Sequence, residues 1–194
     1  EERKLIARTV IETVAGQVPV MVHVGAVSTN DSVELAKDAK RAGAAAVSTL
    51  PPIYYRPGLP GLMQHLRAIA AVGLPTSYYH IPVLTGLDFS AQELVDALTS
   101  IDGVFGLKFT HSELFTMWWI LDAAKGRLRV FNGWDQMLLQ GLMTGACGGV
   151  GSTYNYQMKT IVGIYKAVKA GDFEAARKLQ WKANEVIRVL FRNG

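Results

Sequence analysis

Short apolar runs alternate with amphipathic helical stretches along the whole sequence, and this alternation predicts an α/β fold built on a parallel sheet. Six runs of strand length are present, each is followed by a helical stretch, and most end at polar or Gly-rich residues. The chain has 194 residues, of which 49% are apolar and 19% are charged, so it can bury one core and is too apolar to be disordered. We therefore expect a single domain over residues 1–194.

The six predicted strands are short and rich in Val, Ala and aromatic residues. They span residues 18–24, 45–50, 75–80, 103–109, 128–131 and 146–150. A helix is predicted over residues 1–14, before the first strand. The helices that follow the strands span residues 31–41, 62–72, 90–99, 113–124 and 136–143, and two more close the chain over residues 158–169 and 173–191.

Local signals mark several helix ends. Asp31 with Glu34, and likewise Ser90 with Glu93, have the spacing at which a capping side chain and a glutamate satisfy the first free amides of a helix. Gly43 stands where the helix that begins near Asp31 should stop, because glycine readily adopts the left-handed conformation of a helix C-cap.

Two architectures fit strands that are joined by helices. An open, doubly wound sheet usually carries a Gly-x-Gly-x-x-Gly turn after its first strand, but residues 23–27 read His-Val-Gly-Ala-Val. A (β/α)8 barrel needs about 250 residues. We therefore predict a TIM (β/α)8 barrel, incomplete here, with about six βα units and the C-terminal helices. The missing units are expected before Glu1, which leaves the strands at 18–24 and 146–150 as open edges.

Composition and charge narrow the functional class. Cys147 is the only cysteine, so no intrachain disulfide can form and a cytoplasmic location is expected. The net charge of +4 comes mostly from scattered basic residues, whereas a nucleic-acid surface needs them clustered, so we expect no nucleic-acid partner. No apolar run approaches the length of a membrane span, and we expect no membrane association.

The strand at 103–109 carries the most informative residue. Side chains alternate along a strand, so Phe105, Leu107 and Phe109 should face the helices. Gly106 and Lys108 then face the barrel interior. A buried lysine is rare, and burial disfavours the charged ammonium, which makes a neutral nucleophilic amine available. Lys108 is thus a candidate nucleophile, and a snorkelling or ion-paired lysine is the structural alternative.

Tyr79 and His80 end the strand before it, and His23 lies near the end of the first strand. A phenol at the carboxyl end of a strand can relay a proton, although a tyrosine there is often a core residue with a solvated hydroxyl. We interpret His80 as a structural histidine. Residues two apart on a strand share one face, so His23 lies on the same face as Met21 and Gly25, which we expect to point inward.

Further polar groups follow the other strand ends. Tyr54 and Tyr55 come after the second strand, and residues 132–136 (Asn-Gly-Trp-Asp-Gln) come after the fifth. The Gly-rich residues 148–154 come at the end of the sixth, where free backbone amides could bind an anion or hydroxyls, although a tight turn explains the glycines equally well. Barrel enzymes place their sites at the carboxyl ends of the strands, so this convergence predicts an enzyme site.

The motifs Tyr-His-Ile-Pro (79–82), Gly-Leu-Lys-Phe-Thr (106–110), Gly-Trp-Asp (133–135) and Gly-Ser-Thr-Tyr-Asn (151–155) occur in this order. With them the sequence resembles the superfamily of class I aldolases that contains the N-acetylneuraminate lyases and the dihydrodipicolinate synthases, and within it the lyase branch. The likeness covers essentially the whole chain. It implies a (β/α)8 barrel, a homotetramer, and cleavage of a sialic acid to pyruvate and N-acetylmannosamine.

The resemblance also implies roles for single residues. Lys108 matches the lysine that forms a Schiff base with the substrate ketone, and Tyr79 matches the tyrosine that moves a proton from the C4 hydroxyl. No metal or organic cofactor is implied, because the iminium itself takes up the electrons. Tyr55 matches a tyrosine that in the synthase branch reaches a neighbouring subunit's site. The positions implied to bind the hydroxylated tail of the sugar are Thr110, Gly133, Asp135, Gln136 and Ser152.

Three departures from the family pattern bear on substrate and activity. The family's Asp-Glu pair reads Asp135-Gln136, which keeps hydrogen bonding but loses a charge. The family's Gly-x-[Ser/Thr]-[Ser/Thr]-Gly-Glu loop, which grips the substrate carboxylate, is absent, so we expect residues 1–194 alone to be inactive. Leu84 stands where the synthase branch has an arginine for a dicarboxylate, which favours a sugar-like substrate. The alternatives are a dihydrodipicolinate synthase-like or other pyruvate aldolase, and a non-catalytic barrel fragment.

Overall fold

The computed structural model describes residues 1–193. Within them six parallel strands form one sheet in the order β1-β2-β3-β4-β5-β6. The strands are β1 (Met21–His23), β2 (Ala46–Thr49), β3 (Thr76–His80), β4 (Val104–Phe109), β5 (Arg129–Asn132) and β6 (Gly148–Gly149). All six predicted strands are confirmed, and most are shorter than predicted because the ends of the apolar runs lie in loops.

Helices alternate with these strands. They are α1 (Glu2–Val14), α2 (Thr29–Ala42), α3 (Gly58–Ala70), α4 (Pro82–Thr85), α5 (Ala91–Thr99), α6 (Leu114–Ala124), the 3-10 helix η1 (Asp135–Met137), α7 (Leu138–Thr144), α8 (Tyr154–Lys169) and α9 (Phe173–Asn193). The short helix α4 was not predicted, and α8 begins at Tyr154 rather than at Met158, with non-helical backbone at Gln157. None of the helices described is both long and apolar enough to cross a bilayer.

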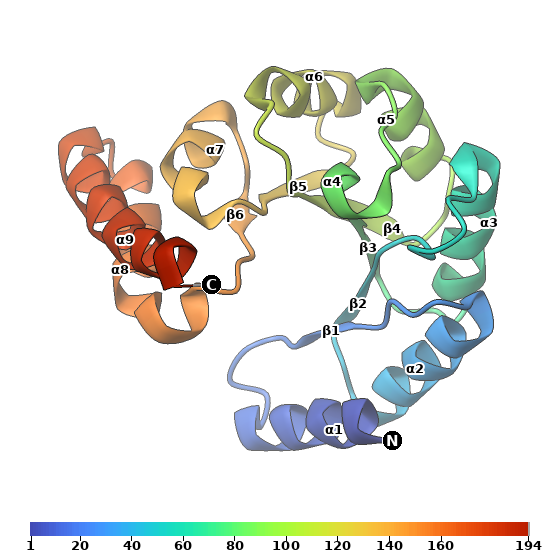
Figure 1. Cartoon of the computed structure of the whole chain (residues 1–194). Helices are drawn as coiled ribbons and strands as arrows, with labels where there is room; N and C mark the ends of the chain where they lie inside the picture. Colours follow the sequence, from blue (N-terminus) through green and yellow to red (C-terminus); the bar gives the residue numbers. More distant parts are fainter. Residues whose placement is uncertain (194) are drawn as a thin grey trace.

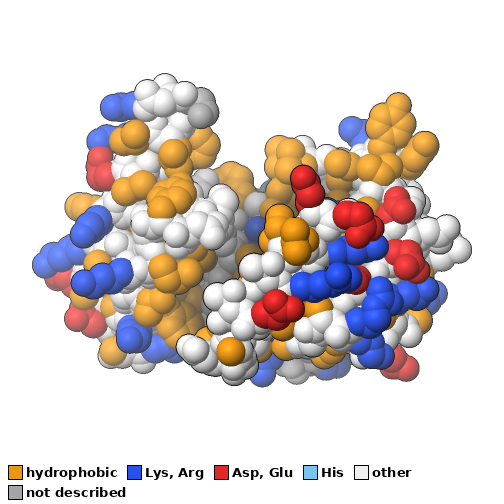
Figure 2. Space-filling model, turned by 90° about the horizontal axis from the view of Figure 1, so that it is seen from below, with side chains coloured by type: hydrophobic (Ala, Val, Ile, Leu, Met, Phe, Trp, Pro, Cys, Tyr) orange, Lys and Arg blue, Asp and Glu red, His pale blue; other side chains and the backbone are white. Residues whose placement is uncertain are grey.

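The strand order decides between the two architectures. A doubly wound sheet reverses its strand order part-way, whereas a barrel adds each new strand on the same side of the last one. Here the order is strictly sequential, and the helices cover the convex side of a curled sheet (Figure 1). β1 and β6 are the two edges of the sheet, as predicted for an incomplete barrel. Seen from below, the surface is hollowed between the first and the last helices (Figure 2).

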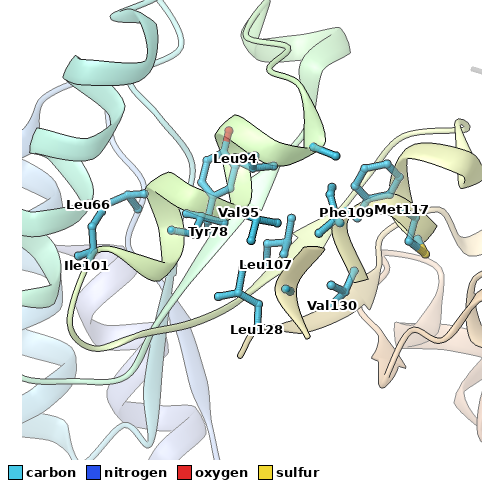
Figure 3. Packing of buried hydrophobic residues seen from close by; sticks show 14 of the residues in the cluster. Leu66, Tyr78, Leu94, Val95, Ile101, Leu107, Phe109, Met117, Leu128 and Val130 are labelled. Carbon is cyan, nitrogen blue, oxygen red and sulfur yellow. The ribbon is translucent and has the colours of Figure 1, made fainter. Parts of the chain in front are cut away.

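The main core lies between strands β3 to β5 and the helices α3, α5 and α6 (Figure 3). Tyr78, Leu107 and Phe109 are fully buried in it, so the face predicted for Leu107 and Phe109 is confirmed. Because these residues alternate with Tyr79 and Lys108, the core packing turns those two side chains toward the concave face.

The orientation predicted for Phe105 is wrong. The pairing of β3 with β4 shifts register, so that Thr76 pairs with Val104 while Ser77 pairs with Gly106. Phe105 is therefore the extra residue of a β-bulge, which reverses the alternation before it. Among the residues described, Val104 packs against the core cluster, and Phe105 does not belong to it.

Of the two helix starts predicted from capping residues, the one at Ser90 is confirmed and the one at Asp31 is wrong. Ser90 and Glu93 form the predicted capping box at the start of α5, and Gly43 ends α2 in the left-handed conformation. Helix α2 begins earlier than predicted, however, because Ser28 rather than Asp31 is the cap and its Oγ accepts from the Asp31 amide. Asp31 instead supplies a negative charge to the first turn, where the helix dipole favours it.

Candidate active site

Lys108 and Tyr79 lie side by side on the concave face of the sheet. They are register partners on the neighbouring strands β4 and β3, and the Lys108 Nζ lies 4.0 Å from the centroid of the Tyr79 ring. On its other side Lys108 pairs with Phe131 of β5. Both Lys108 and Tyr79 are half-buried, so the amine is sheltered by protein and remains within reach of a ligand on the concave face of the sheet.

His23 reaches the same place from β1. Its ring makes an edge-on contact with Tyr79 at 6.1 Å between centroids, which confirms that it points inward. Although one side of the ring is open to solvent, burial of the other side and the positive charges of Arg3 and Lys108 lower the pKa of His23 to about 4. His23 is therefore neutral at pH 7. Arg3 also donates to the carbonyls of His23 (2.8 Å) and Gly25 (2.9 Å), which ties α1 to the end of β1.

His80 lies on the opposite face of the sheet from Lys108. Its ring is buried and stacks on Phe109 at 5.5 Å, so its interpretation as a structural histidine fits the packing. Burial lowers the pKa of His80 to about 4, and among the residues described its Nδ1 has no hydrogen-bond partner. Within residues 1–193, no group of three or more His, Cys, Asp or Glu side chains could hold a metal ion.

A second feature of the concave face is a pocket of about 550 Å³ beyond the carboxyl ends of β4 to β6. Its polar lining brings together every residue predicted for the sugar tail, namely Thr110, Gly133, Asp135, Gln136 and Ser152. Its apolar lining comes from the segment after β3 and from α9, and consists mainly of Ile81, Val83, Leu84, Ile187, Leu190 and Phe191. The pocket therefore combines hydrogen-bonding groups with apolar walls, as small-molecule sites commonly do.

Thr110 and Gly133 form one closely fitted part of this pocket. The Thr110 hydroxyl is buried, and among the residues described it has no hydrogen-bond partner. An unpaired buried hydroxyl is unfavourable, so a ligand hydroxyl would be a stabilising partner. Gly133 is required beside it, because a Cβ at this position would overlap the Thr110 Oγ1 and lie 2.9 Å from the carbonyl of Phe109.

Asp135 is held by the segment that follows β6. Its Oδ2 accepts hydrogen bonds from the amide (2.8 Å) and the hydroxyl (2.7 Å) of Thr153, and Gln157 donates to that hydroxyl at 2.9 Å. A Cβ at Gly151 would overlap the Asp135 carboxylate, so glycine is needed for this close approach. The backbone amide of Thr153, in the Gly-rich segment, thus donates to Asp135 and is not free to bind a ligand.

Tyr55 is not brought to the pocket. It lies in the exposed loop between β2 and α3, where its ring packs edge-on against Tyr54 at 5.1 Å. Among the residues described, Tyr55 is 73% exposed and does not line the pocket. The segments after β3, β4, β5 and β6 thus line the pocket, whereas the loop after β2 follows its strand end but contributes no described residue to the lining.

Sequence reasoning missed the residues that support the pocket. The sequence pattern gives Thr153 no role beyond the Gly-rich loop and gives none to Gln180 of α9, yet both side chains bind Asp135. A signal for Gln180 was present, because it is a lone amide on the apolar stripe of the helix formed by Ala176, Ala183 and Ile187. A polar residue on such a stripe needs a buried partner.

The comparisons with known proteins agree with this geometry. Residues 1–194 match the dihydrodipicolinate synthetase family along their whole length. The chain belongs to this family. It is 40% identical to an N-acetylneuraminate lyase of Escherichia coli (strain SE11) over 195 residues, which is 100% of this chain and 65% of the relative. The chain thus spans 65% of the length of the curated relatives it matches.

Solved structures of the family superpose closely on the chain. CdNal from Clostridium difficile in complex with mannosamine gives a TM-score of 0.94 at 26% identity, covering 98% of this chain and 66% of that one. A catalytic lysine mutant of the sialic acid aldolase from Ruminococcus gnavus gives 0.91 at 28% identity, covering 95% and 61%. The chain, an incomplete TIM barrel, therefore shares its curled six-stranded sheet and helices with the matched parts of these structures.

Proposed function

We propose that the protein is a class I aldolase that cleaves N-acetylneuraminate to pyruvate and N-acetylmannosamine. The observation that carries the proposal is the Lys108–Tyr79 pair, an amine and a phenol on adjacent strands with the Nζ 4.0 Å from the ring centroid. An amine that attacks a ketone and a phenol that moves a proton are the two groups that a Schiff-base retro-aldol reaction needs. The similarity to an N-acetylneuraminate lyase supports the choice of substrate.

The proposed reaction uses only these two groups and water. The Lys108 Nζ adds to the C2 ketone of the open-chain sugar, and water leaves to give an iminium. The C4 hydroxyl loses its proton through Tyr79, the C3–C4 bond breaks, and its electron pair moves into the iminium, so that an enamine and the aldehyde N-acetylmannosamine form. Protonation at C3 and addition of water then release pyruvate and restore the amine. No metal or organic cofactor takes part in this scheme.

The pocket supports a hydroxylated substrate. Its predicted sugar-tail residues lie one to four positions beyond the strand ends, downstream of Lys108, where the tail of a bound sugar would extend. Leu84 is 70% exposed at the apolar rim and offers no guanidinium for a second carboxylate. This favours a sugar over the aldehyde that a dihydrodipicolinate synthase condenses with pyruvate.

We further propose that the active form is a cytoplasmic homotetramer. The exposed position of Tyr55 supports its role as a residue that reaches a neighbouring subunit's site, since it does not line the described pocket of its own chain. The aromatic residues Phe115, Trp118 and Trp119 of α6 are each at least 45% exposed, and a subunit interface would bury them.

The test uses the full gene product that contains these residues. Incubation with pyruvate and borohydride, followed by peptide mass spectrometry, should place a reduced adduct on Lys108. Cleavage of N-acetylneuraminate should be faster than condensation of pyruvate with aspartate semialdehyde. An adduct on another lysine would refute the assigned nucleophile, and faster condensation would favour the synthase. No adduct and no turnover would favour a non-catalytic barrel.

A further inference from the structure

Helix α9 carries a buried side-chain amide, that of Gln180, which binds the backbone at the segment that lines the pocket. Gln180 is 2% exposed, although its neighbours on the same face of the helix, Ala183 and Ile187, are apolar core residues. Its Oε1 accepts from the Leu139 amide at 2.8 Å, and its Nε2 donates to the carbonyl of Asp135 at 3.1 Å. A buried amide with its donors and acceptor paired in this way fixes the groups that it binds.

Asn184 continues this contact one turn further along α9. Its Oδ1 accepts from the Gln180 Nε2 at 2.9 Å, and its Nδ2 donates to the carbonyl of Gln136 at 3.2 Å. The two side chains of α9 therefore bind the carbonyls of two consecutive residues, Asp135 and Gln136, that line the pocket.

The segment held in this way has little regular structure of its own. η1 spans only Asp135–Met137, and the hydrogen bond from the Met137 amide to the Trp134 carbonyl closes its single turn. The Leu139 amide belongs to the first turn of α7, where backbone amides lack a helical partner, and Gln180 supplies that partner. Position and orientation of η1 thus depend on α9 as well as on its own backbone.

We propose that Gln180 and Asn184 are positioning residues that set where Asp135 and Gln136 meet the hydroxylated tail of the substrate. This inference rests on the proposed function. A small displacement of η1 would change the fit of the sugar tail without touching Lys108 or Tyr79, because those two side chains stand on strands β4 and β3. Sugar recognition and Schiff-base formation should therefore separate in variants of α9.

The experiment compares Gln180→Met and Asn184→Leu in the full gene product, with Glu185→Gln as the control on the exposed face of the same helix. Methionine and leucine keep the approximate volume and remove the hydrogen bonds. We expect KM for N-acetylneuraminate to rise about 10-fold in both variants, while the rate of pyruvate trapping by borohydride stays within about twofold of wild type. The control should match wild type in both measurements.

Equal losses of trapping and cleavage in both variants would show a merely structural role and overturn the inference, as would an unchanged KM in both. Asn184 is only half-buried, so its variant keeps the test decisive if Gln180→Met does not fold. A wild-type protein that traps no pyruvate would refute the proposed function itself. A wild type that traps and cleaves, with variants that behave like it, would refute the positioning role alone.

Discussion

The Lys108–Tyr79 pair and the polar pocket are held in place by different means. The pair stands on adjacent strands, and the hydrogen-bond ladder between β3 and β4 sets its spacing. The pocket residues stand on loops and on η1, and side chains of the distant segments α8 and α9 hold them, as Gln180 holds the Asp135 carbonyl. The backbone thus fixes one region, and side-chain hydrogen bonds fix the other.

This difference indicates how the two regions should respond to substitution. A backbone ladder does not depend on the identity of a neighbouring side chain, so the geometry of the Lys108–Tyr79 pair should tolerate change around it. A network of side chains depends on each member, so single replacements should alter the pocket. We therefore expect substitutions in the pocket to change substrate preference while the proposed reaction at the pair is retained.

The largest expected effect is on the pair itself. Lys108→Ala should lower kcat at least about 1,000-fold and abolish the borohydride-trapped pyruvate adduct, because the covalent route disappears. Lys166→Ala, an exposed lysine of α8, is the matched control and should keep both. Activity and peptide mapping in the full gene product measure the effect. An adduct that persists in Lys108→Ala would refute the assignment of Lys108 as the nucleophile, since the reacting amine would then belong to another residue.

The second largest expected effect tests the close packing of Gly133 against Thr110 in the pocket. Gly133→Ala places a Cβ on the Thr110 hydroxyl, so we expect kcat/KM for N-acetylneuraminate to fall about 100-fold through displacement of the loop. Gly148→Ala is the control, because its Cβ would lie 3.7 Å from the nearest atom, Phe131 Cδ1, which is an ordinary contact. Steady-state kinetics of both variants measure the difference. Similar losses in the two variants would argue against a specific role for Gly133.

The opposite face of the sheet should affect stability rather than chemistry. The folded pKa of His80 is about 4, below its ordinary value of 6.5, so between these values the unfolded state binds more protons and stability falls as the pH is lowered. From pH 7 to pH 5 this amounts to about 2 kcal/mol. His80→Phe should reduce the pH dependence of urea unfolding over that range, to which His23 and His65 also contribute, and should leave pyruvate trapping unchanged. An unaltered slope would show that His80 does not titrate in this way.

Much of the fold and the pair could be predicted from the sequence because both follow from local patterns. Alternation predicted that Lys108 faces away from Leu107 and Phe109, and the family resemblance implied a partner role for Tyr79 at the end of the preceding strand. The pattern failed for Phe105, because a β-bulge depends on how two strands pair and leaves no mark in one strand alone.

The support of the pocket could not be predicted in the same way. Gln180 lies 45 residues from Asp135, and Thr153 lies 18 residues from it, so no short motif joins them. The position of Tyr55 was equally beyond local reasoning, since the loop after β2 carries its tyrosines away from the pocket. Contacts such as those of α9 with η1 form only in the folded chain, where α9 packs against the segment that follows β5.

The smallest expected effect distinguishes the two regions most sharply. Gln136→Glu replaces an amide, which donates and accepts, by a carboxylate, which only accepts and adds a negative charge. Asn184 binds the backbone carbonyl of Gln136 and not its side chain, so η1 should stay in place. We expect the ratio of kcat/KM for N-acetylneuraminate to that for its N-glycolyl analogue to change about 10-fold, with pyruvate trapping intact. Gln17→Glu makes the same charge change on an exposed loop and should alter neither value. If trapping falls with Gln136→Glu, the side chain acts near the amine and does not bind the tail, and the separation between the two regions fails.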